Sequence, residues 1–268
     1  MKAINFSYNG LLASDFGLMI CKFDNSEGFN TIEVGSELSL DTISLFNGNK
    51  YALVNTSYNE VNYTFQICKS YCNEKYITPL TINEQRKIVR WLNRNDGYFP
   101  LQIIQSGYEN IIFEGTFNLS AIRFEGEVYG YELTFMMNRP FAIQTKTRFV
   151  LDFSDISKKY TIMDKSDNIG YIYPKIEIKC KSNGDLHLHN SIEDRTTYIK
   201  NCTQNEIITF DEYMNIDSSN DTHKLYNDFN FVFFRIANTY DNKKNIISVD
   251  IPCEITIEYY PIVKGVGL

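Results

Sequence analysis

The chain opens with AINFSYNGLLASDFGL, residues 3–18, and this stretch carries the pattern from which we predict the fold. Residues 3–8 alternate apolar and polar side chains, as a half-buried β-strand does. Asn9 and Gly10 follow, and both tolerate the positive φ angles of a tight hairpin turn. Phe16-Gly17-Leu18 then begins the return of the chain. We therefore expect an N-terminal β-hairpin within a domain built from strands.

The composition of the whole chain indicates a mainly β fold. Its 268 residues suffice for one large β domain or two smaller ones with a substantial core. Nineteen Phe and nineteen Tyr, with many Ile, Thr and Asn and little Ala, favour strands joined by polar turns.

Charge and hydropathy exclude several classes of protein. The net charge of −7, with scattered Lys and Arg, argues against a protein that grips nucleic acid. Polar residues interrupt the N-terminus before any secretion signal, and no apolar run approaches the roughly 20 residues of a membrane helix. We expect a soluble chain made in a cytoplasm, where thiols stay free. Its six cysteines are Cys21, Cys68, Cys72, Cys180, Cys202 and Cys253.

One helix is predicted near residues 82–95. Thr81 and Glu84 have the spacing of a capping box, and apolar residues recur at helical intervals as far as Leu92. Asn95-Asp96-Gly97 should end the helix. Trp91 is the only tryptophan, and we interpret it as an aromatic clamp between helix and sheet.

The alternation of strands divides the chain into two predicted domains. Residues 60–67 alternate without fault, and residues 129–137 form a long strand that Pro140 should end. We therefore place an N-terminal β domain with the one helix at residues 1–140. The second domain, 141–268, should contain strands only.

The second domain has the pattern of a β-sandwich. A strand at 175–181 leads into Ser182-Asn183-Gly184-Asp185, which predicts a hairpin turn before a returning strand at 186–189. Short strands separated by polar turns follow, as in a sandwich. They are expected at residues 207–210, 231–236, 246–251 and 254–259.

No pattern of catalytic or metal-binding residues stands out. His187 and His189 share one strand face, which we expect to be a solvated edge, while His223 lies in a polar loop. Cys68 and Cys72 have no second pair to complete a zinc site. No Gly-x-Ser-x-Gly motif or phosphate-binding glycine loop is present. We expect no enzyme, no cofactor and no metal.

Several motifs in order resemble the distal tail (Dit) proteins of long-tailed bacteriophages, the siphophages. The N-terminal hairpin with its Phe-Gly return and the helix with its Trp-Leu pair match the family's first domain. The succession of strands and turns in the second half matches its C-terminal domain. The residues that carry the resemblance are Phe6, Gly10, Phe16, Gly17, Trp91, Leu92, Pro174 and Asn230.

The resemblance implies an N-terminal β-barrel-like domain that forms a hexameric ring, followed by a C-terminal galectin-like β-sandwich. Such a ring is a structural hub of the virion at the tail tip or baseplate, assembled after synthesis in the host cytoplasm. It joins the tail tube protein to a tail-associated lysin or fibre hub protein and to receptor-binding or other baseplate proteins, and it lets DNA pass. The eight family-motif residues would then shape the fold, with no catalytic group among them.

Two alternatives belong to other functional classes. A carbohydrate-binding sandwich could present aromatic rings such as Tyr198, Tyr213 or Tyr240 to a sugar on the host surface. A β-rich hydrolase acting on cell-wall substrates is the third possibility, without a motif to support it.

Overall fold

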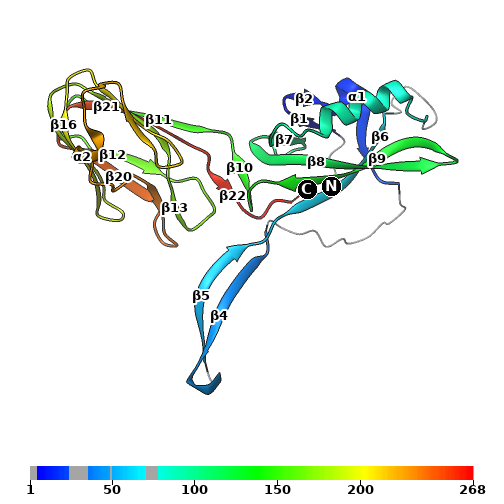
Figure 1. The fold of residues 1–268 in the computed structure, drawn as a ribbon, viewed down its shortest axis with the longest axis horizontal. Coiled ribbons are helices and arrows are strands. Elements are labelled where there is room, and N and C mark those ends of the chain that lie inside the picture. Colours follow the sequence, from blue (N-terminus) through cyan, green and yellow to red (C-terminus); the bar gives the residue numbers. More distant parts are fainter. Residues whose placement is uncertain (1–4, 24–35, 49, 71–77, 268) are drawn as a thin grey trace. The chain divides into compact units, whose positions relative to one another are not determined.

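A computed structural model describes residues 5–23, 36–48, 50–70 and 78–267 (Figure 1). The chain forms two compact units: unit 1 comprises Met1–Gln144 and Val263–Leu268, and unit 2 comprises Thr145–Ile262. The sequence assigned residues 141–144 and the last six residues to the second domain, whereas they group with unit 1. Strand β22 (Ile262–Val263) pairs with β10 (Ala142–Gln144), and the Tyr108 hydroxyl donates a hydrogen bond to the Gly267 carbonyl at 2.9 Å.

Unit 1 is built on one antiparallel sheet with the order β2-β1-β7-β8-β9-β6-β3, to which β10 adds by pairing with β8. This path of described strands ends at β2 and β3, so the sheet is open rather than closed into the expected barrel. The seven strands of the path are β1 (Asn5–Tyr8), β2 (Leu11–Leu12), β3 (Leu18–Cys21), β6 (Asn62–Lys69), β7 (Phe99–Ile104), β8 (Ile111–Phe124) and β9 (Glu127–Met137).

The predicted N-terminal hairpin is confirmed. Ser7 and Tyr8 pair with Leu12 and Leu11, and the turn residues Asn9 and Gly10 have φ angles of 51° and 77°. These are the angles that the Asn-Gly sequence favours. The short helix η1 (Ala13–Phe16) then ends at Gly17, whose φ of 69° allows its N–H to bond back to Ser14 before β3 begins.

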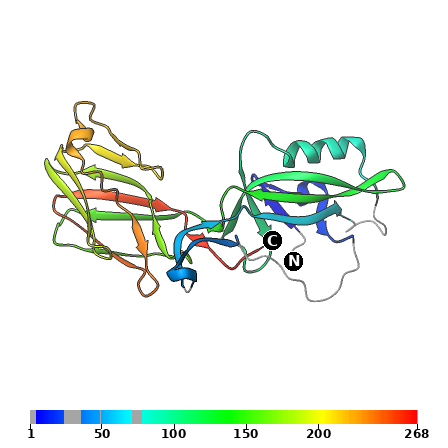
Figure 2. The same ribbon diagram turned by 60° about the horizontal axis from the view of Figure 1, so that its bottom comes forward.

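Helix α1 (Ile82–Leu92) has the predicted capping box. The Glu84 N–H donates to the Thr81 hydroxyl at 3.3 Å, and the Glu84 carboxylate accepts from the Thr81 N–H at 2.7 Å. The helix ends three residues earlier than predicted, because Asn93 leaves helical geometry and donates its side-chain amide to the Phe117 carbonyl at 3.1 Å. Figure 2 shows α1 lying over one face of the sheet of unit 1.

The core of unit 1 is rich in aromatic rings. Trp91 stacks on Phe16 with ring centroids 4.2 Å apart and on Phe6 at 5.6 Å, and its indole N–H donates to the Tyr8 carbonyl at 3.1 Å. It therefore packs between α1 and the N-terminal strands, as the sequence predicted. Tyr63, together with Val61, Phe65 and Ile67, is buried, which confirms the alternation of residues 60–67.

A second hairpin in unit 1 was not singled out from the sequence. It consists of β4 (Leu38–Leu45), the short helix η2 (Phe46–Gly48) and β5 (Lys50–Tyr58). Within the described residues these strands pair only with each other and form a two-stranded sheet of their own (Figure 1).

Unit 2 consists of two main antiparallel sheets around one core that is mostly aliphatic. The first sheet has the order β11-β21-β14-β17-β18, the second β12-β20-β15-β16, and β13 pairs with β19. The strands of the first are β11 (Thr147–Phe153), β14 (Lys175–Cys180), β17 (Ile207–Phe210), β18 (Ile216–Ser218) and β21 (Cys253–Tyr259). The remaining strands are β12 (Tyr160–Met163), β13 (Gly170–Ile172), β15 (Gly184–Asn190), β16 (Arg195–Cys202), β19 (Ile236–Asn238) and β20 (Lys244–Val249).

Three predictions for unit 2 were wrong in detail. The turn at 182–185 does not close a hairpin, because β14 pairs with β17 and β21 whereas β15 pairs with β16 and β20. The turn instead carries the chain from one sheet to the other. The strand expected at 231–236 begins only at Ile236, and Phe231, with a φ of 56°, lies outside extended geometry. A short helix, α2 (Leu225–Asp228), also interrupts the half that was expected to contain strands only.

Candidate assembly surface and a buried polar network

The β4–β5 hairpin presents an apolar surface that the described chain leaves uncovered. Eight of its large apolar side chains are 41–75% exposed. They are Leu38, Leu40, Ile43, Phe46, Tyr51, Leu53, Val54 and Tyr58. A soluble protein rarely exposes such a patch unless it marks a site of interaction.

A β-bulge places five of these eight side chains on one face, whereas Ile43 falls on the other. Asp41 pairs with Asn55 but Thr42 pairs with Leu53, so Val54 is the extra residue. Because side chains alternate between faces, one extra residue reverses the alternation along β5. The register therefore places Leu38, Leu40, Tyr51, Leu53 and Tyr58 on one face. The two charged residues of the strands, Asp41 and Lys50, fall on the other face.

The base of the hairpin is anchored within unit 1. The rings of Tyr58 and Phe141 meet edge to face with centroids 4.8 Å apart. The Lys264 ammonium lies 4.5 Å from the Phe141 ring centroid and donates to the Tyr58 hydroxyl at 3.2 Å. The Ser36 N–H also bonds to the Pro140 carbonyl at 3.1 Å. These contacts fix where the hairpin begins, and among the described strands none pairs with β4 or β5 from outside the hairpin.

The family-motif residues of unit 1 lie together in its core and its first turns. Phe6, Phe16 and Trp91 form one stack of rings, and Leu92 is fully buried beside it. Gly10 and Gly17 supply turns in the left-handed region, as described above.

The two family-motif residues of unit 2 contribute to different parts of its structure. Pro174 is buried immediately before β14. Asn230 is exposed, and its side chain accepts from the Tyr198 N–H and donates to the Thr196 carbonyl, both at 3.1 Å. Asn230 thereby attaches the loop after α2 to the edge strand β16.

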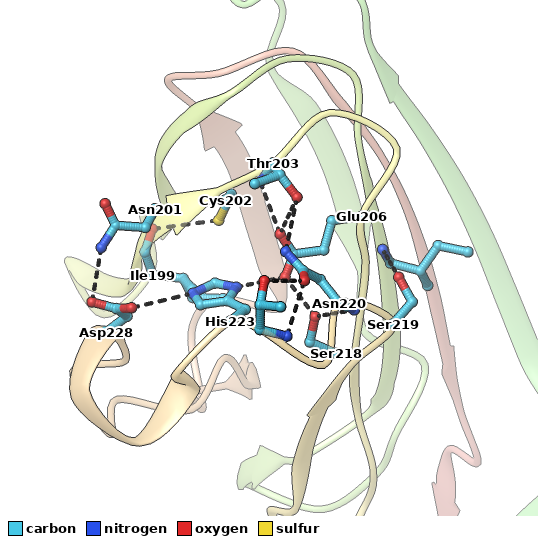
Figure 3. A network of polar contacts seen from close by, with 12 residues as sticks. Ile199, Asn201, Cys202, Thr203, Glu206, Ser218, Ser219, Asn220, His223 and Asp228 are labelled. Atoms are coloured by element: carbon cyan, nitrogen blue, oxygen red, sulfur yellow. Dashed lines mark hydrogen bonds and ion pairs between the residues drawn. The ribbon is translucent and has the colours of Figure 1, made fainter.

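A buried polar network in unit 2, which no motif in the sequence indicated, joins several loops (Figure 3). The Glu206 carboxylate lies 2.5 Å from the Nδ1 of His223, and both side chains are at most 2% exposed. The same carboxylate accepts from the Ser218 hydroxyl at 2.5 Å and from the Thr203 N–H at 2.8 Å. The Nε2 of His223 lies 3.6 Å from the Asp228 carboxylate. His223, expected only in a polar loop, is therefore a buried link between loops.

The network sets the ionisation of Glu206. Burial raises the pKa of this carboxyl group, but hydrogen bonds from Ser218, His223 and Thr203 outweigh burial and leave the pKa below its ordinary value. The carboxylate thus ties the start of β17 to the end of β18 and to the loop before α2. Asn201 extends the attachment to β16 by donating to Asp228 at 3.0 Å. We interpret this network as a clamp for surface loops, since its groups bond to one another.

The two histidines predicted to share a strand face do so, but not at an edge. Leu186 and Leu188 are fully buried, while His187 and His189 point away from the core. Strand β15 lies between β20 and β16, so it is an interior strand of its sheet. His187 pairs with Asp250 and stacks on Tyr198 with ring centroids 4.1 Å apart.

The described residues contain no cluster of His, Cys, Asp and Glu suited to a metal ion. Cys21, Cys68, Cys180, Cys202 and Cys253 are free thiols, and Cys72 lies outside the described residues. Burial raises the pKa of the Cys253 thiol to about 12. Among the described helices, none combines the length and apolar character needed to cross a membrane.

The three tyrosines proposed for sugar binding occupy different settings. Tyr198 has His187 on its ring and donates its hydroxyl to Asp185 at 2.8 Å. Tyr213 and Tyr240 are 75% and 86% exposed, in the turn between β17 and β18 and in the loop between β19 and β20. Tyr198 is therefore committed to contacts within its own sheet.

Comparison with known families identifies the class of protein. Residues 1–139 match the family described as the phage tail protein N-terminal domain, and residues 141–259 match the family described as the phage tail C-terminal domain. The chain therefore belongs to the phage tail proteins. No curated protein matches its sequence.

Solved structures define the fold more closely. The chain is similar to the Dit protein of phage SPP1, described as a paradigm of the hub adsorption apparatus in phages that infect Gram-positive bacteria. The TM-score is 0.66 at 9% identity, covering 97% of this chain and 99% of the other. A chain of the phage P2 baseplate in its activated, calcium-containing conformation has a TM-score of 0.44 at 11% identity, covering 96% and 98%. This phage tail protein has the fold of a distal tail protein.

Proposed function

We propose that this chain is the distal tail hub of its phage, a structural protein without enzymatic activity whose N-terminal units form a hexameric ring. Membership of the phage tail proteins and the distal tail fold support this function. The observation that carries it is the apolar face of the β4–β5 hairpin that the described residues leave exposed, a surface suited to a protein partner.

The physics of the hairpin favours repeated copies of the same chain as that partner. An isolated two-stranded sheet is only marginally stable in water, and a strand pair with one apolar, uncharged face invites further association. A projecting element that meets a different part of the next subunit makes a head-to-tail contact, and such contacts close into rings when the rotation between subunits permits.

The ring would occupy the junction between the tail tube protein and the proteins of the tail tip. On this proposal one side contacts the tail tube protein and the other contacts a tail-associated lysin or fibre hub protein, with unit 2 available to receptor-binding or other baseplate proteins. DNA would pass through the lumen. The net charge of −7 agrees with a channel that does not retain DNA.

The ring can be tested with the purified chain. We expect rings in negative-stain electron microscopy and a mass of six chains by light scattering at micromolar concentration. Leu53→Lys places a charge on the apolar face of the hairpin and should abolish the rings. Val150→Lys, at a position of β11 in unit 2 that is 52% exposed, is the matched control and should leave them intact.

A strictly monomeric mass at all concentrations, with no ring in microscopy even beside tail partners, would contradict the proposal. If the Leu53→Lys and Val150→Lys variants assembled equally well, the apolar face of the hairpin would not be part of the ring interface. In that case another surface of unit 1 would form the ring.

A further inference from the structure

A surface pocket of unit 1 lies at the end of β7 and in the loop that follows it. Ile103, Ile104 and Tyr108 give it a mostly apolar lining. Ile104 is 48% exposed, although β-strand residues of this kind are usually covered. Tyr108 is held in place by the hydrogen bond from its hydroxyl to the Gly267 carbonyl. The pocket is therefore a formed, apolar depression on the surface.

Two polar groups in the pocket lining are suited to a protein chain. The side-chain oxygen of Gln105 is buried and has no hydrogen-bond partner, so rotation of this side chain toward the pocket would let the oxygen accept from an incoming N–H group. Glu109 is the one charged residue among the described residues that line the pocket. Its carboxylate accepts from the Gly107 N–H at 3.0 Å, which holds the charge at the pocket.

The tip of the β4–β5 hairpin has the complementary features. Phe46 is 75% exposed and has a φ of 50°, a backbone conformation that bulky side chains rarely adopt. Such strain is tolerated where it positions a group for a purpose. Lys50, at the start of β5, is the only basic residue between positions 36 and 58. The tip therefore offers an aromatic ring, main-chain N–H groups and one positive charge.

We propose that the hairpin tip of one copy of this chain docks into the β7 pocket of the next copy. Phe46 fills the apolar part between Ile104 and Tyr108, a main-chain N–H of the tip bonds to Gln105, and Lys50 pairs with Glu109. The tip and the pocket belong to different elements of one unit, so the contact is head-to-tail. This inference rests on the proposed ring and names the surfaces that would join its subunits.

Charge exchange tests the ion pair. Lys50→Glu and Glu109→Lys should each raise the chain concentration at half-assembly about tenfold, because each places like charges together. The double variant restores opposite charges and should return the value to within about threefold of the original chain, since coupled residues do not act additively. Lys200→Glu, an exposed change in unit 2, is the control. Sedimentation velocity measures all four variants and the original chain.

Two further variants test the apolar contact. Phe46→Ser should weaken assembly at least tenfold without changing the thermal unfolding of the chain. Phe124→Ser is the matched control, because Phe124 is also exposed, at 65%, beside the turn between β8 and β9. In a background with Cys21→Ser and Cys72→Ser, a Phe46→Cys, Ile104→Cys double variant should link neighbouring copies through a short bismaleimide, and neither single variant should do so.

The outcomes separate this inference from the ring itself. If rings form but the double charge variant does not restore assembly and no cross-link appears between copies, the tip-and-pocket contact is wrong and the proposed ring remains supported. Rescue in the double charge variant together with cross-links between copies would establish the contact. A chain that is monomeric throughout would contradict both the contact and the ring.

Discussion

Two hairpins of unit 1 have similar secondary structure and opposite surroundings. Strands β8 and β9 are flanked by β7 and β6, and their inward residues Phe117 and Phe135 are at most 1% exposed. Strands β4 and β5 have no flanking strand among the described residues, and Leu40 and Leu53 are more than half exposed. The comparison teaches that apolar side chains in strands serve either the fold or an interaction, according to what covers them.

The largest expected effect concerns the covered hairpin. Phe117→Ala should lower the free energy of unfolding of unit 1 by about 3–5 kcal/mol, because Phe117 touches Phe6, Tyr8, Phe65 and Phe135 and its loss leaves a cavity. Urea unfolding followed by Trp91 fluorescence measures this, since the only tryptophan lies in unit 1. Phe124→Ala, on the same strand but exposed, is the control. Equal losses of unfolding free energy in Phe117→Ala and Phe124→Ala would contradict the prediction that the buried ring contributes more to stability than the exposed one.

The second largest effect on stability is expected for the polar network around Glu206 in unit 2. This network is buried like the β8–β9 hairpin, but it is held together by hydrogen bonds. Glu206→Gln should destabilise unit 2 by about 2 kcal/mol at neutral pH, because it weakens hydrogen bonds to a buried carboxylate. Exposed Glu212→Gln is the matched control. Calorimetry measures the transition of unit 2, and an unchanged transition in Glu206→Gln would refute the clamp.

The pH dependence of unit 2 follows from the same carboxylate. The folded pKa of Glu206 is lowered, so its contribution to stability is complete above the unfolded pKa of about 4.3. That contribution is lost as the pH falls through the folded pKa. The difference in melting temperature between the original chain and Glu206→Gln should therefore be largest at neutral pH and shrink in acid. A difference that grows below pH 4 would have the wrong sign.

A smaller effect is expected at the helix that covers the sheet. Thr81→Ala removes the capping hydroxyl of α1 and should cost unit 1 about 1 kcal/mol. Thr81→Ser keeps the hydroxyl and should recover most of the loss. Urea unfolding monitored by Trp91 fluorescence compares the two variants.

The smallest effect on stability should come from the uncovered hairpin. Leu40→Ser is expected to change the free energy of unfolding by no more than about 0.5 kcal/mol, because its side chain is 54% exposed. The same variant should reduce assembly. A loss of stability comparable to that of Phe117→Ala would mean that the hairpin belongs to the fold rather than to an interface.

Local chemistry made part of the fold predictable. The Asn9-Gly10 turn and the Thr81-Glu84 capping box depend on residues a few positions apart, so the sequence determines them directly. The alternation of residues 60–67 likewise identifies the buried face of β6. Their success shows that short-range patterns suffice when the partner groups are neighbours in the chain.

The predictions that were wrong concern features that depend on contacts between residues far apart in the sequence. The turn at 182–185 has a hairpin sequence, yet β14 finds better partners in β17 and β21, which lie far along the chain. The β4–β5 face is exposed because no other described strand pairs with this hairpin. The surroundings of His223 include Glu206 and Asp228, which come from other parts of the chain. No local pattern encodes these relations.

The sequence by itself determined the β class, the N-terminal hairpin, the capped helix and the resemblance to distal tail proteins, because these follow from periodicity and short motifs. Only the tertiary structure decided that residues 263–268 return to unit 1 and that the described residues leave the β4–β5 hairpin without a flanking strand. It also decided that the bulge at Val54 places five exposed apolar side chains on one face, namely Leu38, Leu40, Tyr51, Leu53 and Tyr58. The physical reason is that burial and register depend on partners distant in sequence.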